Sequence, residues 1–239
     1  MTPDAAKLYE VAEQTWPPAR VWTEGPFTLR EGAGGGKRVS AATALGPVEE
    51  RDIDLAEAGM RGAGQRPLFM IRAGEDALDA LLAARGYALI DEVVMYVRPI
   101  DALTDKPVPR VTCFTIWEPL AIMCEIWAKG GIGPARLAVM ARAQTKTGIL
   151  TRWNEKPAGV GFAAVHGEVC MVHAVEVLEH QRKQGVAEWM MRAAAFWGAQ
   201  QGARDLAVLC VAANKPANAF YAKLGFVPVG RYHYRRLPD

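Results

Sequence analysis

Gln181-Arg182-Lys183-Gln184-Gly185-Val186-Ala187 joins an apolar strand, expected at 169–177, to an amphipathic helix, expected at about 184–201. A basic, glycine-containing turn at a helix N-terminus presents unpaired backbone N–H groups and a favourable dipole to an anion. This turn therefore predicts a site for a phosphate-bearing ligand such as a pyrophosphate. Beyond the helix we expect a strand at 205–211, a helix at about 215–223 and a strand at 226–234.

The residues before this stretch extend the same pattern. They predict a strand at 111–117, helices near 118–129 and 133–144, and strands at about 147–153 and 158–166. The second half of the chain therefore has the element order βααβββαβαβ. The polar segment 101–110 contains two prolines and predicts a surface linker, which divides the chain into domains 1–105 and 106–239.

The first half has a related organisation. A helix at 4–15 ends at Trp16-Pro17-Pro18, because proline cannot continue it. Strands at 27–30 and 37–45 are expected to form a hairpin through the glycine-rich segment 32–36. Helices near 49–61 and 75–85 flank a strand at 67–71, and a strand at 87–98 follows. Both halves end with a helix, a glycine, an aromatic residue and a strand, which suggests tandem related domains, although this punctuation is common in α/β proteins.

Composition restricts the class of protein. Of 239 residues, 51% are hydrophobic and 23% are charged, which is typical of a folded globular chain. The formal net charge of +2 and the lack of a basic patch argue against nucleic-acid binding. The four cysteines and four histidines show no paired metal-ligand spacing, so we expect reduced core cysteines and no metal. No signal peptide and no apolar run long enough to span a membrane is evident, and we expect a cytoplasmic protein without membrane contact.

The two motifs together resemble the GCN5-related N-acetyltransferase (GNAT) family. Residues 182–187 fit that family's pyrophosphate-loop signature Gln/Arg-x-x-Gly-x-Gly/Ala, with alanine at the last position. The spacing of its closing motif is matched by Asn214, Ala217, Tyr221, Gly225 and Phe226. The resemblance covers about 110–234 and implies an α/β GNAT fold, a mixed central sheet flanked by helices. The first half would then be a degenerate GNAT-like domain in tandem.

The resemblance also implies where acetyl-CoA would bind. Backbone N–H groups would hold its pyrophosphate, with the Arg182 and Lys183 side chains nearby. The strand segment 175–177 would pair with the pantetheine arm beside a splay between neighbouring strands, and its amides would polarise the thioester carbonyl. Asn214 would lie across the cleft. The implied cofactor-binding residues are Val175, Glu176, Val177, Arg182, Lys183, Gln184, Gly185, Val186, Ala187 and Asn214.

Tyr221 matches the family's general acid, which protonates the departing thiolate, and a phenol with a reference pKa of about 10 stays protonated near neutral pH. The alternative is a ring that only packs between helix and strand. For the general base, His173 is the first choice, because a strand histidine has this role in the arylalkylamine branch of the family. It can equally be a histidine that lines the core or cleft.

Glu168, at the start of the same strand, is the second choice for the base, and its alternative is a solvated turn residue. Glu176 should point to the opposite face from His173 in a regular strand, unless a bulge changes the alternation. Trp117 and Trp127 lie where the family builds its acceptor pocket, but simple packing also accounts for them.

The first half has no match to the pyrophosphate-loop signature. We expect it to wall the acceptor site or to act as a separate partner-binding module. The sequence as a whole favours an N-acyltransferase that moves an acetyl group from acetyl-CoA directly to a primary amine of a small molecule or peptide. The alternative is a non-catalytic acyl-CoA-binding or sensing protein. The acceptor has no recognisable code in the sequence, and a monomer or a homodimer is expected.

Overall fold

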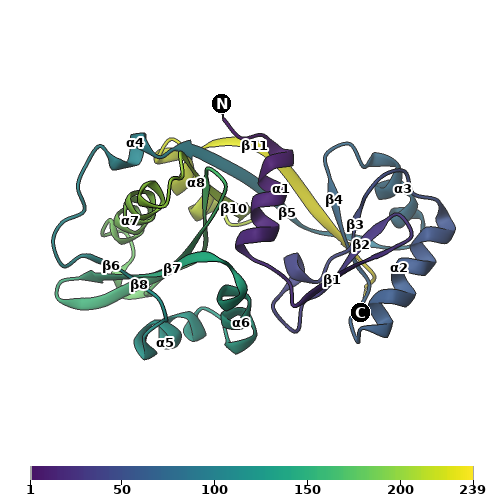
Figure 1. The fold of residues 1–239 in the computed structure, drawn as a ribbon, viewed down its shortest axis with the longest axis horizontal. Coiled ribbons are helices and arrows are strands. Elements are labelled where there is room, and N and C mark those ends of the chain that lie inside the picture. Colours follow the sequence, from purple (N-terminus) through teal and green to yellow (C-terminus); the bar gives the residue numbers. More distant parts are fainter. Residues whose placement is uncertain (1, 239) are drawn as a thin grey trace.

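Two long strands, β5 (Ala88–Pro99) and β11 (Val227–Arg236), connect the two halves of the chain in the computed structural model, which describes residues 2–238. Both lie in an eight-stranded sheet with the strand order β4-β11-β5-β10-β9-β8-β7-β6. Only β9 and β10 pair in parallel; the other neighbours in this sheet are antiparallel. Helices flank this mixed sheet (Figure 1), which confirms the predicted fold class.

The second half follows the predicted order closely. Its strands are β6 (Cys113–Ile116), β7 (Thr145–Trp153), β8 (Lys156–His166), β9 (Val169–Val177) and β10 (Asp205–Val211), followed by β11. Its helices are α4 (Asp101–Thr104), α5 (Ala121–Lys129), α6 (Pro134–Arg142), the short 3-10 helix η2 (Glu179–Gln181), α7 (Val186–Gln200) and α8 (Lys215–Lys223). The segment 101–110 is therefore partly helical, and Leu103 of α4 is buried, so it is more closely packed than a surface linker.

The first half also contains a small three-stranded sheet, β1-β2-β3. The strands of the first half are β1 (Arg20–Glu24), β2 (Phe27–Glu31), β3 (Thr43–Ala44) and β4 (Leu68–Arg72), followed by β5. Its helices are α1 (Ala5–Thr15), the 3-10 helix η1 (Lys37–Val39), α2 (Glu50–Gly62) and α3 (Asp76–Ala84). The predicted antiparallel pairing of 27–30 with 37–45 is confirmed in part, because β2 pairs with β3 at Phe27–Ala44 and Thr28–Thr43. Residues 37–39 are helical, however, so the connection between the two strands is longer than a turn at 32–36.

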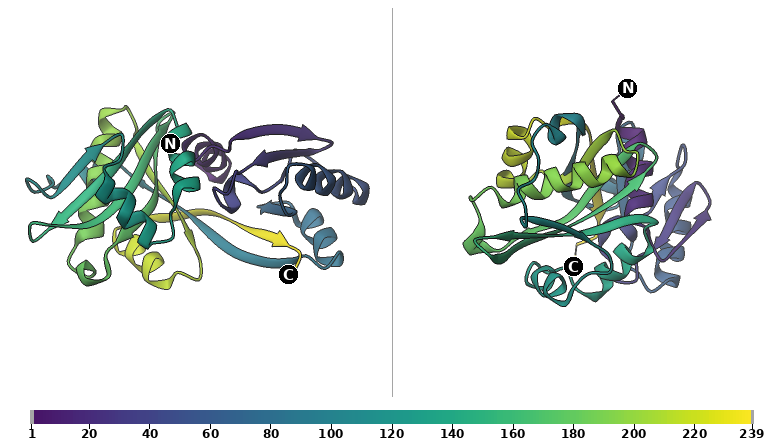
Figure 2. Two further views of the ribbon diagram at one scale, coloured as in Figure 1. Left: turned by 90° about the horizontal axis from the view of Figure 1, so that it is seen from below. Right: turned by 60° about the vertical axis from the view of Figure 1, so that its left-hand side comes forward.

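The final strand of each half lies within the sheet of the other half. β5 lies between β10 and β11, whereas β11 lies between β4 and β5. Figures 1 and 2 show both strands running along the long axis of the molecule, from one half into the other. The central strands of the two halves are thus shared.

The order of elements repeats along the chain. β1-β2-β3-α2-β4-α3-β5 in the first half has the same order as β7-β8-β9-α7-β10-α8-β11 in the second. A parallel bridge between Ala42 and Phe69 links the β3 and β4 regions, as β9 pairs in parallel with β10. Before β1, the described residues of the first half form the single helix α1, whereas β6, α5 and α6 precede β7 in the second half. A tandem relation of the halves is consistent with this order.

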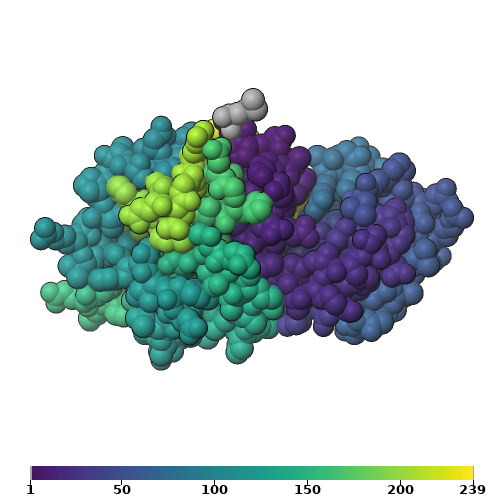
Figure 3. Space-filling model, in the orientation of Figure 1, coloured from purple at the N-terminus to yellow at the C-terminus, as the bar shows by residue number. Residues whose placement is uncertain are grey.

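The eight-stranded sheet has two covered faces. On one face α7 and α8 pack on a cluster that includes Val94, Val172 and Val208. On the other face α1 packs over Met95 and Met171, while α5 and α6 cover Phe162. Figure 3 shows α1, in purple, lying between the second half and the rest of the first half.

Candidate active site

The predicted phosphate-binding turn connects β9, through η2, to the start of α7. Two residues of this turn have left-handed backbone conformations, Lys183 with φ of 60° and Gly185 with φ of 82°. Among the described residues, none accepts a hydrogen bond from the backbone N–H groups of 183–188. The first N–H groups of any helix lack partners within the helix, and here the preceding turn adds further free N–H groups. Together they form a concave array of donors of the kind that binds anions.

A cavity of about 610 Å³ adjoins this turn, between the N-terminus of α7, the end of α8 and the α4 region. Val177, Gly185, Val186 and Ala187 contribute to its wall. Its basic lining residues are Arg98, Arg182, Lys183, Arg192 and Lys223. Asp105 and Glu188 also line it, but both are paired with Arg192, at 2.6 and 3.1 Å respectively. The cavity therefore has an excess of positive charge that suits a polyphosphate.

Sequence reasoning missed Arg98, which comes from β5 of the first half and reaches the cavity only because β5 lies beside β10. Its guanidinium packs against Gly225, where an added Cβ would overlap Nη1. Gly225 also has φ of 77°. Both its backbone conformation and the lack of space for a side chain therefore favour glycine at this position of the closing motif. No local signal in the sequence connects Arg98 with the turn.

The parallel strands β9 and β10 separate beside this turn. Their pairing ends at Val172 and Val208, although β9 continues to Val177 and β10 to Val211. The edge of β9 that faces β10 is therefore open over Val175–Val177, where the resemblance places the pantetheine arm. An open strand edge can accept a further extended chain through its unpaired backbone groups.

Tyr221 of α8 lies on the β10 side of this opening. Its ring is buried and contacts Tyr96 and Phe226 at centroid distances of 6.0 and 5.7 Å. Burial, with a smaller effect of the Cys210 thiol, raises the pKa of the Tyr221 hydroxyl. No described residue forms a hydrogen bond with this hydroxyl. Tyr221 thus combines firm ring packing with a protonated hydroxyl that has no protein partner.

His173 lies in β9 on the face covered by α1, with both ring nitrogens in contact with first-half residues. Nδ1 is 3.0 Å from Arg38 Nη1, which can only donate, and Nε2 is 2.9 Å from Thr15 Oγ1. The Thr15 hydroxyl donates to the Val11 carbonyl, so Nε2–H donates to Thr15. Burial, with the charge of Arg38, lowers the pKa of His173 well below its usual range. The imidazole is neutral, and this arrangement leaves it no free lone pair to accept a proton.

Glu176 shares a face with His173, because β9 contains a bulge. His173 pairs with Phe162 and Glu176 with Val160, so Ala174 and Val175 together oppose Gly161. Ala174 has φ of 51°, and its carbonyl accepts a hydrogen bond from Trp127 Nε1 at 2.8 Å. The regular alternation that would separate the two side chains is therefore interrupted.

The Glu176 side chain lies against Gly130 at the end of α5, where an added Cβ would overlap its carboxyl group. Burial raises the pKa of this carboxyl group, and the charges of Arg182 and Arg136 oppose that rise. Glu176 is thus a half-buried carboxyl group beside the open part of β9.

Two predicted residues lie elsewhere. Glu168 precedes β9, at the end opposite to the turn, and its carboxylate is paired with Arg204 at 3.1 Å on the surface. The structure does not bring it together with Tyr221 or Gly185. Asn214 is the N-cap of α8, and its side chain accepts a hydrogen bond from the N–H of Ala217. It lies just after β10, at the same end of the sheet as the opening.

The two tryptophans singled out from the sequence pack on the face of the sheet that α5 and α6 cover. Trp127 is fully buried, and it fixes the bulge through its bond to Ala174. Trp117 contacts Phe162 edge to face, and the Lys146 ammonium group lies over its ring. Within residues 2–238, no group of three or more His, Cys, Asp or Glu side chains is arranged to hold a metal ion. No helix in this range is long and apolar enough to cross a membrane.

The acetyltransferase (GNAT) family profile matches residues 115–226, which include the turn, the open strand edge and Tyr221. The chain therefore contains a domain of the GNAT acetyltransferase family. This assignment supports acyl transfer as the general chemistry of the domain. A search of curated proteins gives no significant match.

Solved structures are similar over nearly the whole chain. A GCN5-related N-acetyltransferase from Kribbella flavida has a TM-score of 0.72 at 18% identity, covering 98% of this chain and 96% of that one. A conserved protein of unknown function from Staphylococcus epidermidis has a TM-score of 0.70 at 12% identity, covering 94% and 96%. A tandem GNAT protein from the clavulanic acid biosynthesis pathway has a TM-score of 0.58 at 14% identity, covering 89% and 78%. At these identities the likeness concerns the fold.

Proposed function

We propose that this protein is an N-acetyltransferase that transfers the acetyl group of acetyl-CoA directly to a primary amine of a small molecule or peptide. The observation that carries the proposal is the array of free N–H groups at 183–188, which opens onto a basic cavity beside the gap between β9 and β10. A phosphate-binding turn and an open strand edge in one cleft suit a ligand with a pyrophosphate and an extended amide arm.

In this proposal the donor's pyrophosphate binds the N–H groups of 183–188, and Arg182, Lys183 and Arg98 provide positive charge nearby. The pantetheine arm pairs with β9 at Val175–Val177, which brings the thioester to the bulge. Backbone N–H groups there stabilise the oxyanion that forms when the amine attacks. The C–N bond forms first as the amine loses a proton to the base, and the C–S bond breaks when the oxyanion collapses, so no covalent enzyme intermediate is needed.

Tyr221 is the proposed general acid, which gives its proton to the departing thiolate of CoA. For the general base we propose Glu176 in place of His173 or Glu168, because its carboxylate lies beside the open part of β9. The raised pKa of Glu176 makes it a better proton acceptor than an ordinary surface carboxylate, either directly or through water. His173 instead holds α1 and Arg38 against β9.

The test is release of CoA from acetyl-CoA across a panel of amines, with the wild-type protein and the Tyr221→Phe variant. Loss of a general acid should lower kcat by about 100-fold or more. Phenylalanine keeps the ring contacts with Tyr96 and Phe226, so the melting temperature and the affinity for acetyl-CoA should change little.

A different result would favour a sensing protein. If acetyl-CoA binds tightly, no amine in a broad panel causes CoA release and Tyr221→Phe has no effect, the transferase proposal fails.

A further inference from the structure

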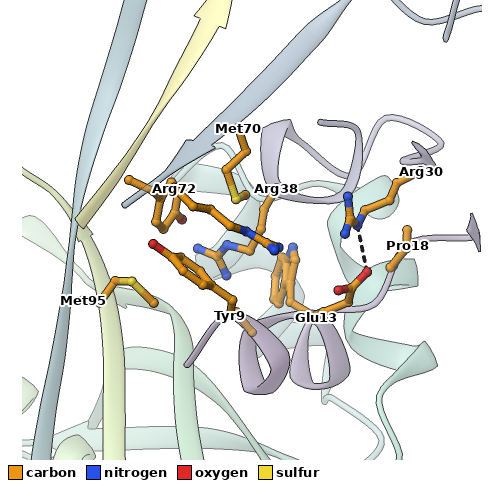
Figure 4. A pocket seen from close by; sticks show the side chains of 11 residues that line it. Tyr9, Glu13, Pro18, Arg30, Arg38, Met70, Arg72 and Met95 are labelled. Carbon is orange, nitrogen blue, oxygen red and sulfur yellow. Dashed lines mark hydrogen bonds and ion pairs between the residues drawn. The ribbon is translucent and has the colours of Figure 1, made fainter. Parts of the chain in front are cut away.

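Three arginine side chains from the first half converge between α1, η1 and β4 (Figure 4). Arg30, Arg38 and Arg72 line a small pocket, which we call the arginine pocket, together with Tyr9, Glu13 and Trp16. The free space inside it is about 20 Å³. It lies on the face of the sheet that α1 covers, next to His173, and outside the cavity at the turn before α7.

Arg30 already has an anionic partner and several hydrogen bonds. Its Nε donates to Glu13 at 2.8 Å, as the dashed line in Figure 4 marks, and its Nη1 donates to the Ala41 carbonyl and to Thr43 Oγ1, both at 3.0 Å. Glu13 is the acidic residue of the pocket lining, and its bond to Arg30 is the ion pair found within that lining. The Glu13 carboxylate is therefore already paired with Arg30.

Within the described part of the chain, neither Arg38 nor Arg72 forms an ion pair through its guanidinium group. The Arg72 guanidinium lies 4.6 Å from the centroid of the Tyr9 ring, and no described residue accepts a hydrogen bond from it. Arg38 donates one bond, to the neutral His173. The Nε atoms of both residues are buried with no acceptor among residues 2–238. Figure 4 shows both side chains extending into the middle of the pocket.

Two partly buried like charges without a counter-ion are unfavourable. Burial, with the charge of Arg30, lowers the pKa of Arg72. Glu75 is the acidic group with the largest opposing influence on Arg72, but its carboxylate accepts a bond from the backbone N–H of Arg72 at 2.7 Å. The guanidinium groups themselves still need an anion, and paired arginines are well suited to hold a carboxylate.

We propose that the arginine pocket binds the carboxylate group of the acceptor, so that the acceptor is a small amino carboxylate. This inference rests on the proposed function. Its free space accommodates a group of one or two water-sized atoms and is too small for a nucleotide. Arg38 contacts His173, which shares a face of β9 with Glu176, so the arginine pocket lies on the same face of β9 as the proposed general base.

The proposal is tested by thermal unfolding of the protein without acetyl-CoA, in the presence of the common free amino acids and of their carboxamides. At least one amino acid should raise the melting temperature, and its amide, which lacks the negative charge, should not. In Arg72→Gln and in Arg38→Gln the affinity for that amino acid should fall by about tenfold or more, as expected for a lost hydrogen bond to a charged group.

Arg51→Gln is the matched control, because Arg51 is a highly exposed cation paired at the surface with Glu49, and its loss should leave the ligand response unchanged. Unliganded Arg72→Gln should unfold at the same temperature as the wild type or higher, because a buried, unpaired charge is removed. A strictly structural arginine would give the opposite result.

Release of CoA separates this inference from the proposed function. If CoA is released from acetyl-CoA equally well with amino acids and their amides, and no amino acid alters the melting temperature, the carboxylate pocket is wrong while the transferase stands. If an amino acid stabilises the wild type but not Arg72→Gln, and no amine causes CoA release, the pocket stands and the transferase proposal fails.

Discussion

Glu176 shows how one backbone irregularity changes the assignment of a residue. The strict alternation of a strand predicts that it points away from the face of His173, but the bulge at Ala174 and Val175 returns both side chains to one face. The sequence gives no reliable sign of this bulge, because alanine and valine are both ordinary strand residues. The alternation expected for a regular strand therefore does not apply across this bulge, which is the exception stated for it.

A pH profile tests the role of Glu176. Its carboxylate form accepts the proton, so kcat/KM should fall as the pH decreases through the pKa of Glu176, which burial raises above its usual value of 4.5. In Glu176→Gln we expect kcat/KM to drop by about 100-fold and this acidic limb to disappear. The profile is measured with saturating acetyl-CoA from pH 5 to 9.

His173→Gln is the comparison for this measurement. Glutamine can keep a hydrogen bond to Thr15 or Arg38, and its variant should retain the acidic limb. Should His173→Gln lose the limb while Glu176→Gln keeps it, histidine would be the base. The partners of His173 come from α1 and η1, which are remote in sequence, so its closed hydrogen bonding was not predictable from β9 alone.

Two helix N-termini in equivalent positions of the two halves differ in what they can bind. At α7 the N–H groups of 183–188 are free beside basic side chains. At α2 the first turn is closed by a capping box between Glu49 and Asp52, and Glu50 adds further negative charge. Acidic groups stabilise a helix N-terminus but repel a phosphate there. The first half therefore has no equivalent of the phosphate-binding turn at α2.

The turn before α7 is tested with two glycine variants. Gly185 and Gly202 flank α7, and both have left-handed backbone conformations, with φ of 82° and 87°. Alanine is strained by about 1 to 2 kcal/mol in this conformation, so both Gly185→Ala and Gly202→Ala should be less stable to a similar extent. Relief of the strain at Gly185 rotates the free N–H groups, and we expect the dissociation constant for acetyl-CoA to rise about tenfold in Gly185→Ala only.

Titration calorimetry with acetyl-CoA measures this difference. Equal affinities in Gly185→Ala and the wild type would contradict the role of the turn. An equal loss in Gly202→Ala would point to general destabilisation, because an added Cβ at Gly202 meets no atom within 4 Å.

The elements of the second half were largely predictable, whereas part of the first half was not. Strong periodicity and glycine punctuation locate β7 to β11 and both α7 and α8 within a few residues. In the first half the glycines of 32–36 lie in a long connection between the antiparallel strands β2 and β3, and an additional strand, β1, pairs with β2 through a turn at Gly25 and Pro26. Val21 is exposed in β1, which pairs only with β2, so β1 carries little of the alternating apolar pattern that reveals a strand.

At the scale of the whole molecule, the two halves depend on each other through the exchanged strands. The local sequence of a strand does not indicate which distant strand it pairs with. The position of β5 beside β10, and with it the position of Arg98 in the cavity, could therefore not be predicted. The ion pair of Asp79 in α3 with Arg235 in β11, at 2.8 Å, also connects the halves. A division at 105 and 106 cuts through the eight-stranded sheet, leaving β4 and β5 on one side and β6 to β11 on the other.

This arrangement predicts the behaviour of the separated segments. Fragments 1–105 and 106–239, produced alone, should be unfolded or aggregated. The first lacks β11, which lies between its strands β4 and β5, and the second lacks β5, which lies between its strands β10 and β11. Mixed during refolding, they should recover the circular dichroism spectrum and the acetyl-CoA affinity of the intact chain. If fragment 106–239 were a folded monomer that binds acetyl-CoA with unchanged affinity, the exchanged strands would not be needed for the site.

Binding of the acetyl-CoA pyrophosphate by the N–H groups of 183–188 is central to the proposed function. It is measured most directly by the backbone amide resonances of the isotope-labelled protein during titration with acetyl-CoA. We predict that the largest changes occur at residues 183–188 and along Val175–Val177. Saturable binding that leaves the resonances of 183–188 unchanged and shifts those of a different region would contradict it.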